Sequence, residues 1–480
     1  MQVLKNYING ELLDPGSQQW LDNYNPATGQ VYSQLPNSDS NDVHAAVQAA
    51  RQAFPAWSRS STEERSGYLF KLARLIEEHA DELARLESID NGKPLSLARS
   101  VDIPRAIKNF HFFAQAIAMF SSETHENIAQ SAVNMVLREP LGVVACISPW
   151  NLPLYLLTWK IAPALITGNC VVAKPSEITP MTAYRLSELC IEAGLPKGVL
   201  NIVHGEGNTV GQALVEHRDI KAISFTGGTS TGADIATRAA GQFKKLSLEL
   251  GGKNPNIIFP DCDYEKALDT AVNAAFKNQG QICLCGSRFF IADSMYDKFK
   301  YDFIERTRAL TVGDPLDAKS DIGALVSREH LQKVYYYIKH ADELGGKILF
   351  GGKRLHPKGH EDGNFLQPTI IEVNDNQCPL NQEEIFGPVV TLCRFASEAE
   401  AVALANDVRY GLSASIWTRD VNRALRVSKN LQAGTVWVNT WMLRDPRVPF
   451  GGVKASGVGR EGGLEALRFF TEPKNVCIQY

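Results

Sequence analysis

The stretch AISFTGGTSTG, residues 222–232, joins a short apolar run to a glycine-rich turn and the start of a helical pattern. The run Ala222 to Phe225 predicts a strand. At the start of the helix that follows, the free backbone amides and the helix dipole favour a phosphate group. This stretch therefore predicts one strand-turn-helix unit of an α/β sheet, with a turn suited to a nucleotide.

Similar units repeat on both sides of this stretch. From about residue 141, short β-branched runs alternate with helical stretches, and one of these helices is expected to have Thr179 as its N-cap and Pro180 as its first residue. This alternation is typical of a doubly wound α/β sheet. A second alternation, from about residue 265 to 450, predicts a second α/β domain. The strands predicted for the first sheet are 143–147, 171–174, 199–203, 222–225 and 256–259.

The segments before and after these alternations have their own patterns. Apolar residues at helical spacing over 43–54 and 69–83 predict that two helices open the protein. Ser61 with Glu64 resembles a capping box for the second helix, and Asn91-Gly92 predicts its end. The last residues, 475–480, predict a strand whose partner is either the segment 120–140 or a neighbouring subunit.

Composition limits the possible functions. A chain of 480 residues is too long for one compact core and predicts two or three domains. Its 44% hydrophobic and 21% charged residues are typical of soluble globular proteins. A net charge of -4 gives no electrostatic reason to bind nucleic acid or an anionic membrane, so small-molecule partners are expected. The N-terminus lacks the pattern of a signal or transit peptide, so we expect a cytoplasmic protein.

The cysteines indicate reduced thiols. There are nine, an odd number without regular spacing, which argues against a disulfide framework. Cys283 and Cys285 form the only close pair, with no second pair and no nearby histidine, so no metal site is expected.

Two further segments favour a nucleotide ligand on the first sheet. Residues 205–211 follow a predicted strand, but their third glycine comes one position late for GxGxxG, so a structural turn is an equal alternative. The strand that ends in Lys174-Pro175-Ser176-Glu177 places charges at a carboxyl edge, where ligands of open α/β sheets bind. A carboxylate at Glu177 would accept from ribose hydroxyls and repel a 2'-phosphate. These residues favour NAD over NADP.

Three separate segments supply the parts of a covalent catalyst. Cys283 lies in the glycine-flanked sequence QGQICLC, residues 279–285, and Glu249 precedes a glycine pair in LELGG, residues 248–252. With the distant Asn151, these residues offer a nucleophile, a base and an oxyanion donor. They predict acyl chemistry on sulfur.

In this chain, seven motifs resemble those of the aldehyde dehydrogenase superfamily in the order that the family has them. They are Asn25-Pro26-Ala27-Thr28-Gly29, Pro149-Trp150-Asn151, Ala173-Lys174-Pro175-Ser176-Glu177, the Glu249 and Cys283 segments, Glu383-Glu384-Ile385-Phe386-Gly387-Pro388, and Pro449-Phe450-Gly451-Gly452. The resemblance covers essentially the whole chain and implies three parts. These are a Rossmann-like NAD-binding domain of residues 1–119 and 141–250, an α/β catalytic domain of residues 251–450, and an oligomerisation arm of residues 120–140 and 466–480.

The resemblance also implies a role for each catalytic residue. Cys283 would attack the aldehyde carbon to give a thiohemiacetal, and Asn151 with the backbone N–H of Cys283 would hold the oxyanion. Transfer of hydride to NAD would leave a thioester, against which Glu249 would activate water. Cys285 is expected to be only a packed neighbour.

For the cofactor, the resemblance places the nicotinamide ribose on Glu384, the ring near Phe386 and the adenosine ribose on Lys174. Gly228 departs from the family pattern, because many relatives carry serine there, which removes one side-chain contact but keeps the backbone amides. The residues expected to contact NAD are Ile147, Ser148, Pro149, Trp150, Lys174, Ser176, Glu177, Gly207, Gly211, Phe225, Thr226, Gly227, Gly228, Leu250, Glu384 and Phe386.

Several other segments resemble the 2-aminomuconate and 2-hydroxymuconate 6-semialdehyde dehydrogenases within this superfamily. They are residues 102–105, 109–113, 148–164, 282–285 and 441–444. That resemblance implies that Arg105 and Arg444 clamp the distant carboxylate of a semialdehyde, with Tyr155 and Trp159 in the substrate tunnel. The alternatives are a helix-surface arginine for Arg105 and an internal ion pair with Asp445 for Arg444.

Other functions stay open at this point. They are a broad-specificity or betaine-type aldehyde dehydrogenase, a CoA-dependent acylating enzyme, a cysteine esterase without hydride transfer, and a non-catalytic relative that kept the fold. Glu249 favours hydrolysis over transfer to CoA. A homo-oligomer, dimer or tetramer, is expected because an edge strand needs cover.

Overall fold

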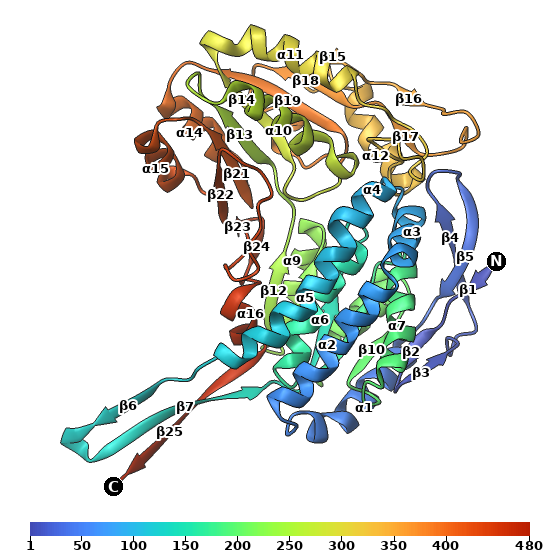
Figure 1. Cartoon of the computed structure of the whole chain (residues 1–480), viewed down its shortest axis with the longest axis vertical. Coiled ribbons are helices and arrows are strands. Elements are labelled where there is room, and N and C mark those ends of the chain that lie inside the picture. The colour runs from blue at the N-terminus through green and yellow to red at the C-terminus, as the bar shows by residue number, and fades with distance from the viewer.

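The computed structural model describes residues 1–480 and contains two large β-sheets, from which a long β arm extends (Figure 1). The first sheet has eight strands. Their order is β24 (Gly457–Val458), β12 (Lys245–Glu249), β11 (Ile220–Thr226), β8 (Val143–Ile147), β9 (Cys170–Lys174), β10 (Leu200–Ile202), β2 (Asn6–Ile8) and β3 (Glu11–Leu13). The five strands from β12 to β10 run parallel to one another. The predicted α/β class is confirmed.

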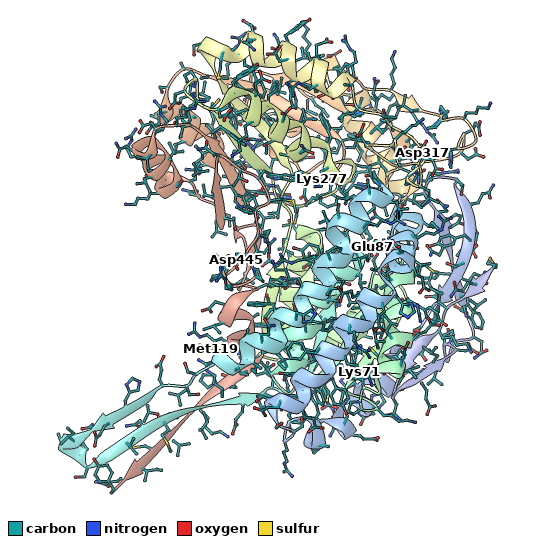
Figure 2. The ribbon with its side chains drawn as sticks, in the orientation of Figure 1. Lys71, Glu87, Met119, Lys277, Asp317 and Asp445 are labelled. Carbon is teal, nitrogen blue, oxygen red and sulfur yellow. The ribbon has the colours of Figure 1, made fainter.

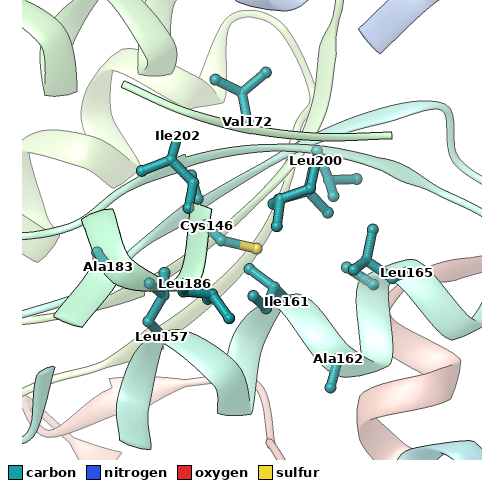
Figure 3. Close-up of a cluster of buried hydrophobic side chains, with 14 of the residues drawn as sticks. Cys146, Leu157, Ile161, Ala162, Leu165, Val172, Ala183, Leu186, Leu200 and Ile202 are labelled. Carbon is teal, nitrogen blue, oxygen red and sulfur yellow. The ribbon is translucent and has the colours of Figure 1, made fainter. Parts of the chain in front are cut away.

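Helices bury both faces of this sheet. They are α1 (Ser40–Trp57), α2 (Thr62–Glu78), α3 (Ala80–Asn91), α5 (Ile103–Ala116), α6 (Pro153–Ile166), α7 (Met181–Ala193), α8 (Gln212–Glu216), α9 (Thr229–Ala240) and α16 (Gly463–Phe469), with a short α4 (Leu95–Leu97). Figure 3 shows Leu157, Ile161 and Leu165 of α6 beside Cys146 of β8, in one hydrophobic core. Full burial of each such leucine or isoleucine contributes about 1.5–3 kcal/mol.

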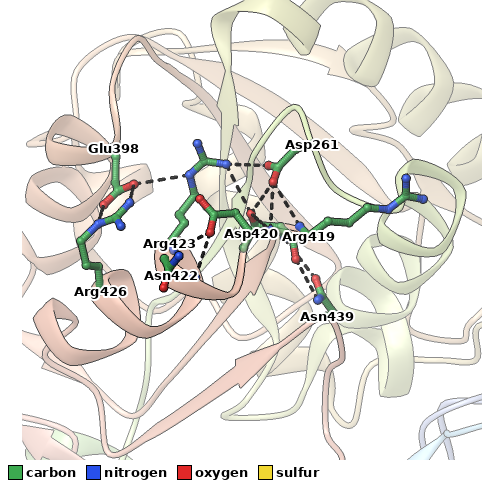
Figure 4. A network of polar contacts seen from close by, with 9 residues as sticks. Asp261, Glu398, Arg419, Asp420, Asn422, Arg423, Arg426 and Asn439 are labelled. Atoms are coloured by element: carbon green, nitrogen blue, oxygen red, sulfur yellow. Dashed lines mark hydrogen bonds and ion pairs between the residues drawn. The ribbon is translucent and has the colours of Figure 1, made fainter.

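The second sheet has seven strands and carries the remaining helices. Its order is β15 (Gly346–Phe350), β18 (Thr369–Val373), β19 (Val389–Phe395), β14 (Gly286–Ala292), β13 (Asn254–Ile258), β21 (Ser413–Trp417) and β22 (Thr435–Val438). Its helices are α10 (Tyr264–Phe276), α11 (Tyr296–Arg308), α12 (Arg328–Lys339), α13 (Pro379–Gln382), α14 (Glu398–Asn406) and α15 (Val421–Asn430). Figure 4 shows how Asp261, just after β13, accepts from the backbone of Arg419 and Asp420 and pairs with Arg423 of α15.

The arm is a three-stranded sheet that joins distant parts of the chain. The C-terminal strand β25 (Thr471–Gln479) pairs with β7 (Ala132–Pro140), which pairs with β6 (Thr124–Asn127). The segment 120–140 is therefore the partner of the last strand within this chain. Small sheets join β1 (Gln2–Val3) with β5 (Gln30–Pro36) and β4 (Trp20–Asn25), β16 (Arg354–Leu355) with β17 (Phe365–Leu366), and β20 (Tyr410–Gly411) with β23 (Val453–Lys454).

Three sequence predictions about these elements were wrong. Strands, not helices, open the protein: β1 to β5 precede α1, and most are too short to leave a periodic pattern. The strand predicted at 256–259 forms, as β13, but it belongs to the second sheet, and the strands of the first sheet beyond β11 are β12 and the edge strand β24. Thr179 does not cap α7, because Asp90 accepts from the backbone N–H of Met181 at 2.9 Å and so takes that role.

The other helix signals were borne out in part. Ser61 caps α2 by accepting from the backbone N–H of Glu64, but the expected single helix breaks at His79 into α2 and α3. Gly92 ends α3 with φ of 84°, as a left-handed glycine stop requires. No helix of the chain is both long enough and apolar enough to cross a membrane.

Candidate active site

The predicted cofactor residues converge because the parallel strands of the first sheet end together. The register pairs Ile147 with Lys174, Ile147 with Phe225, and Thr226 with Glu249. The turns that follow β8, β9 and β11 therefore share one carboxyl edge, which is the usual ligand edge of an open α/β sheet.

A cavity of about 260 Å³ lies at this edge, between the first sheet and the cysteine loop of the second. It brings Asn151 and Cys283 together with half of the residues expected to contact NAD. Those residues are Pro149, Trp150, Thr226, Gly227, Gly228, Leu250, Glu384 and Phe386. Gly227 is required here, since a Cβ at that position would come within 2.4 Å of the Phe225 ring.

The other predicted cofactor residues do not line this cavity. Ile147 and Phe225 belong to the strands that lead into the lining turns, Ser148 directly follows the first of these strands, and Ser176 accepts from the backbone N–H of Ile178 in a turn. Lys174 and Glu177 form an ion pair of 2.9 Å. Although burial raises the pKa of Glu177, Lys174 and the backbone of Gly207 bring it below its ordinary value. Gly211 lies against the Lys174 side chain. Lys174, Glu177, Gly207 and Gly211 therefore form a second cluster along the same edge.

The cysteine loop has an unusual backbone. Asn278, Gln279 and Gly280 all have positive φ, at 53°, 56° and 70°. Two consecutive non-glycine residues in that region are held by surrounding contacts, and such conformations cluster at functional sites. Asn254 helps to fix this loop, because its Nδ2 donates to the carbonyl oxygens of Cys283 and Cys285 at 2.7 and 2.8 Å.

Cys283 and Cys285 lie in different surroundings. Cys283 is half-buried and faces the cavity, whereas Cys285 is buried in the hydrophobic cluster beneath the loop. The backbone N–H of Cys283 donates to no acceptor in the chain. Burial raises the pKa of the Cys283 thiol, as do the carboxyls of Glu384 and Glu249, so the resting sulfur is protonated.

Asn151 faces the same sulfur loop from the first sheet. It is 3% exposed, and its Nδ2 donates to the carbonyl oxygen of Gln281 at 3.0 Å. An amide nitrogen carries two hydrogens, so the second remains available to an oxyanion formed beside Cys283.

Glu249 lies at the end of β12 with no hydrogen-bond partner. It is 5% exposed, and neither carboxyl oxygen is paired. Burial raises its pKa well above that of an exposed carboxyl, and the neighbouring Glu461 raises it further. Gly451 leaves room for it, since a Cβ there would come within 2.8 Å of its Oε1.

Behind Glu249 is a buried ion pair that sequence reasoning missed. Lys160 of α6 pairs with Glu461 at 2.6 Å, and both contact Ser224. The one available signal was Lys160 itself, a charge within the most apolar segment of the chain.

Glu384 is positioned by the glycine pair after β12. Its Oε1 accepts from the backbone N–H of Gly252 at 2.8 Å. A Cβ on Gly251 would come within 2.2 Å of the other carboxyl oxygen, so only glycine allows this approach.

His330 and Lys333 of α12 also line the cavity, and neither was predicted. His330 Nε2 donates to the carbonyl oxygen of Phe386 at 2.7 Å, and the Trp150 ring packs edge-on against both His330 and Phe386. No motif marks these two residues in the sequence, because α12 reaches the cavity only through the packing of the two sheets.

The two arginines expected at the far end of the substrate lie near each other, and Arg444 also lies near the cysteine. Arg105 is buried, and its Nε donates a hydrogen bond to Asn109 Oδ1, whereas one terminal nitrogen has no partner. Its guanidinium packs over the rings of Tyr155 and Trp159, 5.3 and 5.1 Å from the ring centres. It is not a helix-surface arginine.

Arg444 makes no ion pair and packs over the Phe450 ring at 3.7 Å. Asp445 pairs with Arg447 at 2.6 Å, so the expected competitor for Arg444 is occupied. Burial raises the pKa of both Cys283 and Glu249, and the charge of Arg444 is near enough to oppose that rise; it also acts on Arg105. Two guanidinium groups that form no ion pair thus lie near each other, and that of Arg444 lies near the sulfur.

A thiol beside a nucleotide-sized cleft, with an amide and an unpaired carboxyl nearby, defines an α/β enzyme that works through a covalent bond to sulfur. Residues 13–476 match the model of the Aldehyde dehydrogenase family, and the chain belongs to this family. The resemblance found in its seven motifs is confirmed.

Named relatives cover the whole chain. A 2-aminomuconic semialdehyde dehydrogenase of Danio rerio is 50% identical over 481 residues, which cover 100% of this chain and 98% of the relative. A 2-hydroxymuconic semialdehyde dehydrogenase of Pseudomonas sp. (strain CF600) is 43% identical, with 100% of both chains covered. A point mutant of betaine aldehyde dehydrogenase from Staphylococcus aureus, solved in complex with NAD+, has a TM-score of 0.97 at 39% identity, over 100% of this chain and 98% of that one.

Proposed function

We propose that the protein oxidises a carboxylated semialdehyde to the diacid, with NAD as the oxidant and a thioester on Cys283 as the intermediate. The observation that carries this proposal is the arginine pair: Arg105 and Arg444 lie near each other without forming an ion pair, and Arg444 lies near Cys283. A planar guanidinium binds a carboxylate through two parallel hydrogen bonds, which are stronger away from water.

The residues of the cleft fit NAD. The glycines at 227, 228 and 251 leave backbone approachable, Glu384 is anchored towards the cavity, and Glu177 with Lys174 supports the adenosine end. Bound NAD supplies the hydride acceptor. The names of the relatives and the NAD+ complex of a neighbouring structure support this assignment.

The chain's own residues carry the remaining steps. The Cys283 thiol releases its proton to solvent as its sulfur bonds to the aldehyde carbon, and the carbonyl oxygen becomes an oxyanion that accepts from Asn151 Nδ2 and the N–H of Cys283. After oxidation to the thioester, Glu249 takes a proton from water as that water attacks the acyl carbon. The carbon–sulfur bond breaks, the thiol is regenerated, and the acid leaves.

The arginine pair makes a testable prediction. Arg105→Met and Arg444→Met are each expected to lower kcat/KM for a carboxylated semialdehyde by about 10–100-fold, because each removes a charged hydrogen bond of roughly 1.5–3 kcal/mol. An uncharged aldehyde of equal length should lose less than about threefold. Arg74→Met is the matched control, since Arg74 is exposed on α2 and pairs only with Glu78. Equal losses on both aldehydes would argue against the clamp.

The cofactor preference makes a second prediction. Glu177→Ser is expected to raise kcat/KM for NADP relative to NAD by about 10-fold or more, because it removes a carboxylate that repels a 2'-phosphate. Initial rates at varied NAD and NADP measure the ratio. An unchanged ratio would place the ribose away from Glu177.

One assay tests the function as a whole. Purified protein with NAD and 2-aminomuconate or 2-hydroxymuconate 6-semialdehyde should form NADH and the free acid, whereas the cation betaine aldehyde should be a poor substrate. The betaine aldehyde dehydrogenase neighbour makes that cation the relevant second candidate. NADH formation from betaine aldehyde alone would overturn the proposed substrate class.

We also propose a function for each part of the chain. The first sheet with residues 1–119 and 141–250 binds NAD, residues 251–450 carry the catalytic loop, and the arm of residues 120–140 and 466–480 joins subunits of a homo-oligomer. In support, apolar side chains on the arm, such as Ile128, Leu137 and Ile478, are exposed in the single chain.

A further inference from the structure

A buried lysine, Lys93, lies between α3 and the start of α5, next to the loop that carries Asn151. Lys93 follows the glycine stop of α3 and has no exposure, and its Nζ lies 3.0 Å from Asp102 and 3.6 Å from Glu87, which are equally buried. Glu87, labelled in Figure 2, comes from α3, and Asp102 immediately precedes α5. A buried lysine needs such partners, and its position is thereby fixed.

The same ammonium group holds the backbone of Asn151. Lys93 Nζ donates to the carbonyl oxygen of Asn151 at 3.0 Å, and Asn278 Nδ2 donates to that oxygen at 3.1 Å. Glu87 accepts from the backbone N–H of Leu154 at 3.3 Å, just at the start of α6. One charged cluster thus holds the loop that carries the oxyanion amide at Asn151 itself and at the start of the helix that follows it.

Asp102 connects this cluster to the substrate arginine. It precedes α5, and Arg105 lies in the first turn of that helix, three residues later. A shift of Lys93 would therefore move both the Asn151 loop and the helix that carries Arg105. Burial raises the pKa of Glu87, Lys93 opposes that rise and Asp102 adds to it, so Lys93 is the charge that balances the two carboxyls of the cluster.

We propose that Lys93 is a positioning residue for the reaction, which fixes Asn151 relative to Arg105. The inference rests on the proposed function. A semialdehyde gripped by its carboxylate at Arg105 presents its carbonyl at a set distance, and Lys93 keeps the Asn151 amide at that distance. Lys93 itself touches no substrate.

A double-mutant cycle tests this role. Lys93→Met, which keeps the length of the side chain, should lower kcat/KM for the carboxylated semialdehyde by about 10–100-fold in the otherwise native enzyme, comparable to the loss of one oxyanion donor. In an Asn151→Ala background the same change should cost less than about threefold, since a residue that acts through Asn151 has nothing left to position.

Alkylation of Cys283 by iodoacetamide is the readout that separates positioning from general damage. This alkylation forms no oxyanion, so the alkylation rate of Lys93→Met should stay within about twofold of the native rate. Additive losses in the cycle, or a parallel fall in alkylation, would overturn the proposal. If Lys93→Met fails to fold, Asp102→Asn replaces it in the same double-mutant cycle. This change keeps the size of the side chain and leaves Glu87 as the ion-pair partner of Lys93. Native enzyme that oxidises no aldehyde would instead refute the proposed function.

Discussion

Cys283→Ala is expected to abolish aldehyde oxidation, with kcat reduced by on the order of 10⁴-fold or more. The sulfur is the only thiol among the residues that line the cavity, and it lies beside the Asn151 amide and the free N–H of its own residue. Removing it leaves the aldehyde carbon without a covalent partner. Direct hydride loss from a hydrated aldehyde, without that bond, gains nothing from the oxyanion donors.

Cys285→Ala is the matched control for this change. Its thiol is two residues away, but it is buried in the cluster beneath the loop and does not line the cavity. The control should keep kcat within about threefold of the native value, with some loss of stability from the small void. NADH formation measures turnover, and intact mass after quenching shows the acyl adduct, which Cys283→Ala should lack. Activity that survives in Cys283→Ala and disappears in Cys285→Ala would exchange the two assignments.

The same pair of variants separates the dehydrogenase from a cysteine esterase. An esterase that used Cys283 would hydrolyse esters equally well without NAD and would oxidise no aldehyde. The nucleotide edge of the first sheet, with Glu384 anchored by Gly252, would then have no purpose. Measuring both reactions on one preparation decides between them.

The parts of the site that short motifs encode were predictable from the sequence. A strand that ends in a glycine-rich turn before a helix, as at Phe225-Thr226-Gly227, has one local explanation, and the parallel register then brings several such turns to one edge. The glycines of LELGG also had a physical reason, because Gly251 and Gly252 admit Glu384 and the carbonyl of Cys283. Local chemistry was therefore enough for those residues.

Contacts between distant elements were not predictable. The sequence left open whether Arg105 is a surface residue and whether Arg444 pairs with Asp445, and only the fold shows that Arg105 is buried and that Asp445 is taken by Arg447. Lys93 and His330 act through backbone carbonyls, which carry no sequence signal. The prediction that strand 256–259 belongs to the first sheet was wrong for the same reason, because strand pairing is non-local.

Glu249→Gln is expected to stop turnover after the first oxidation. The change keeps the shape of the side chain and removes its basicity, so hydrolysis of the thioester should slow by about 10²–10⁴-fold. Attack by Cys283 and the first hydride transfer keep their oxyanion donors and need this base less. Rapid mixing with aldehyde and NAD should therefore show a burst of NADH near one equivalent per site, followed by a slow steady state.

The pH profile supplies an independent check on the same residue. Burial, with Glu461, raises the pKa of Glu249 well above its ordinary value, so the carboxyl is protonated at low pH and becomes a base only as the pH rises through that pKa. The native steady-state rate should rise across this interval, and the Gln variant should lose that rise. Added hydroxylamine, which attacks a thioester without a base, should restore turnover to Glu249→Gln. A variant with no burst and no rescue would mean that Glu249 acts before the thioester forms, as the base for Cys283, whose own pKa burial also raises.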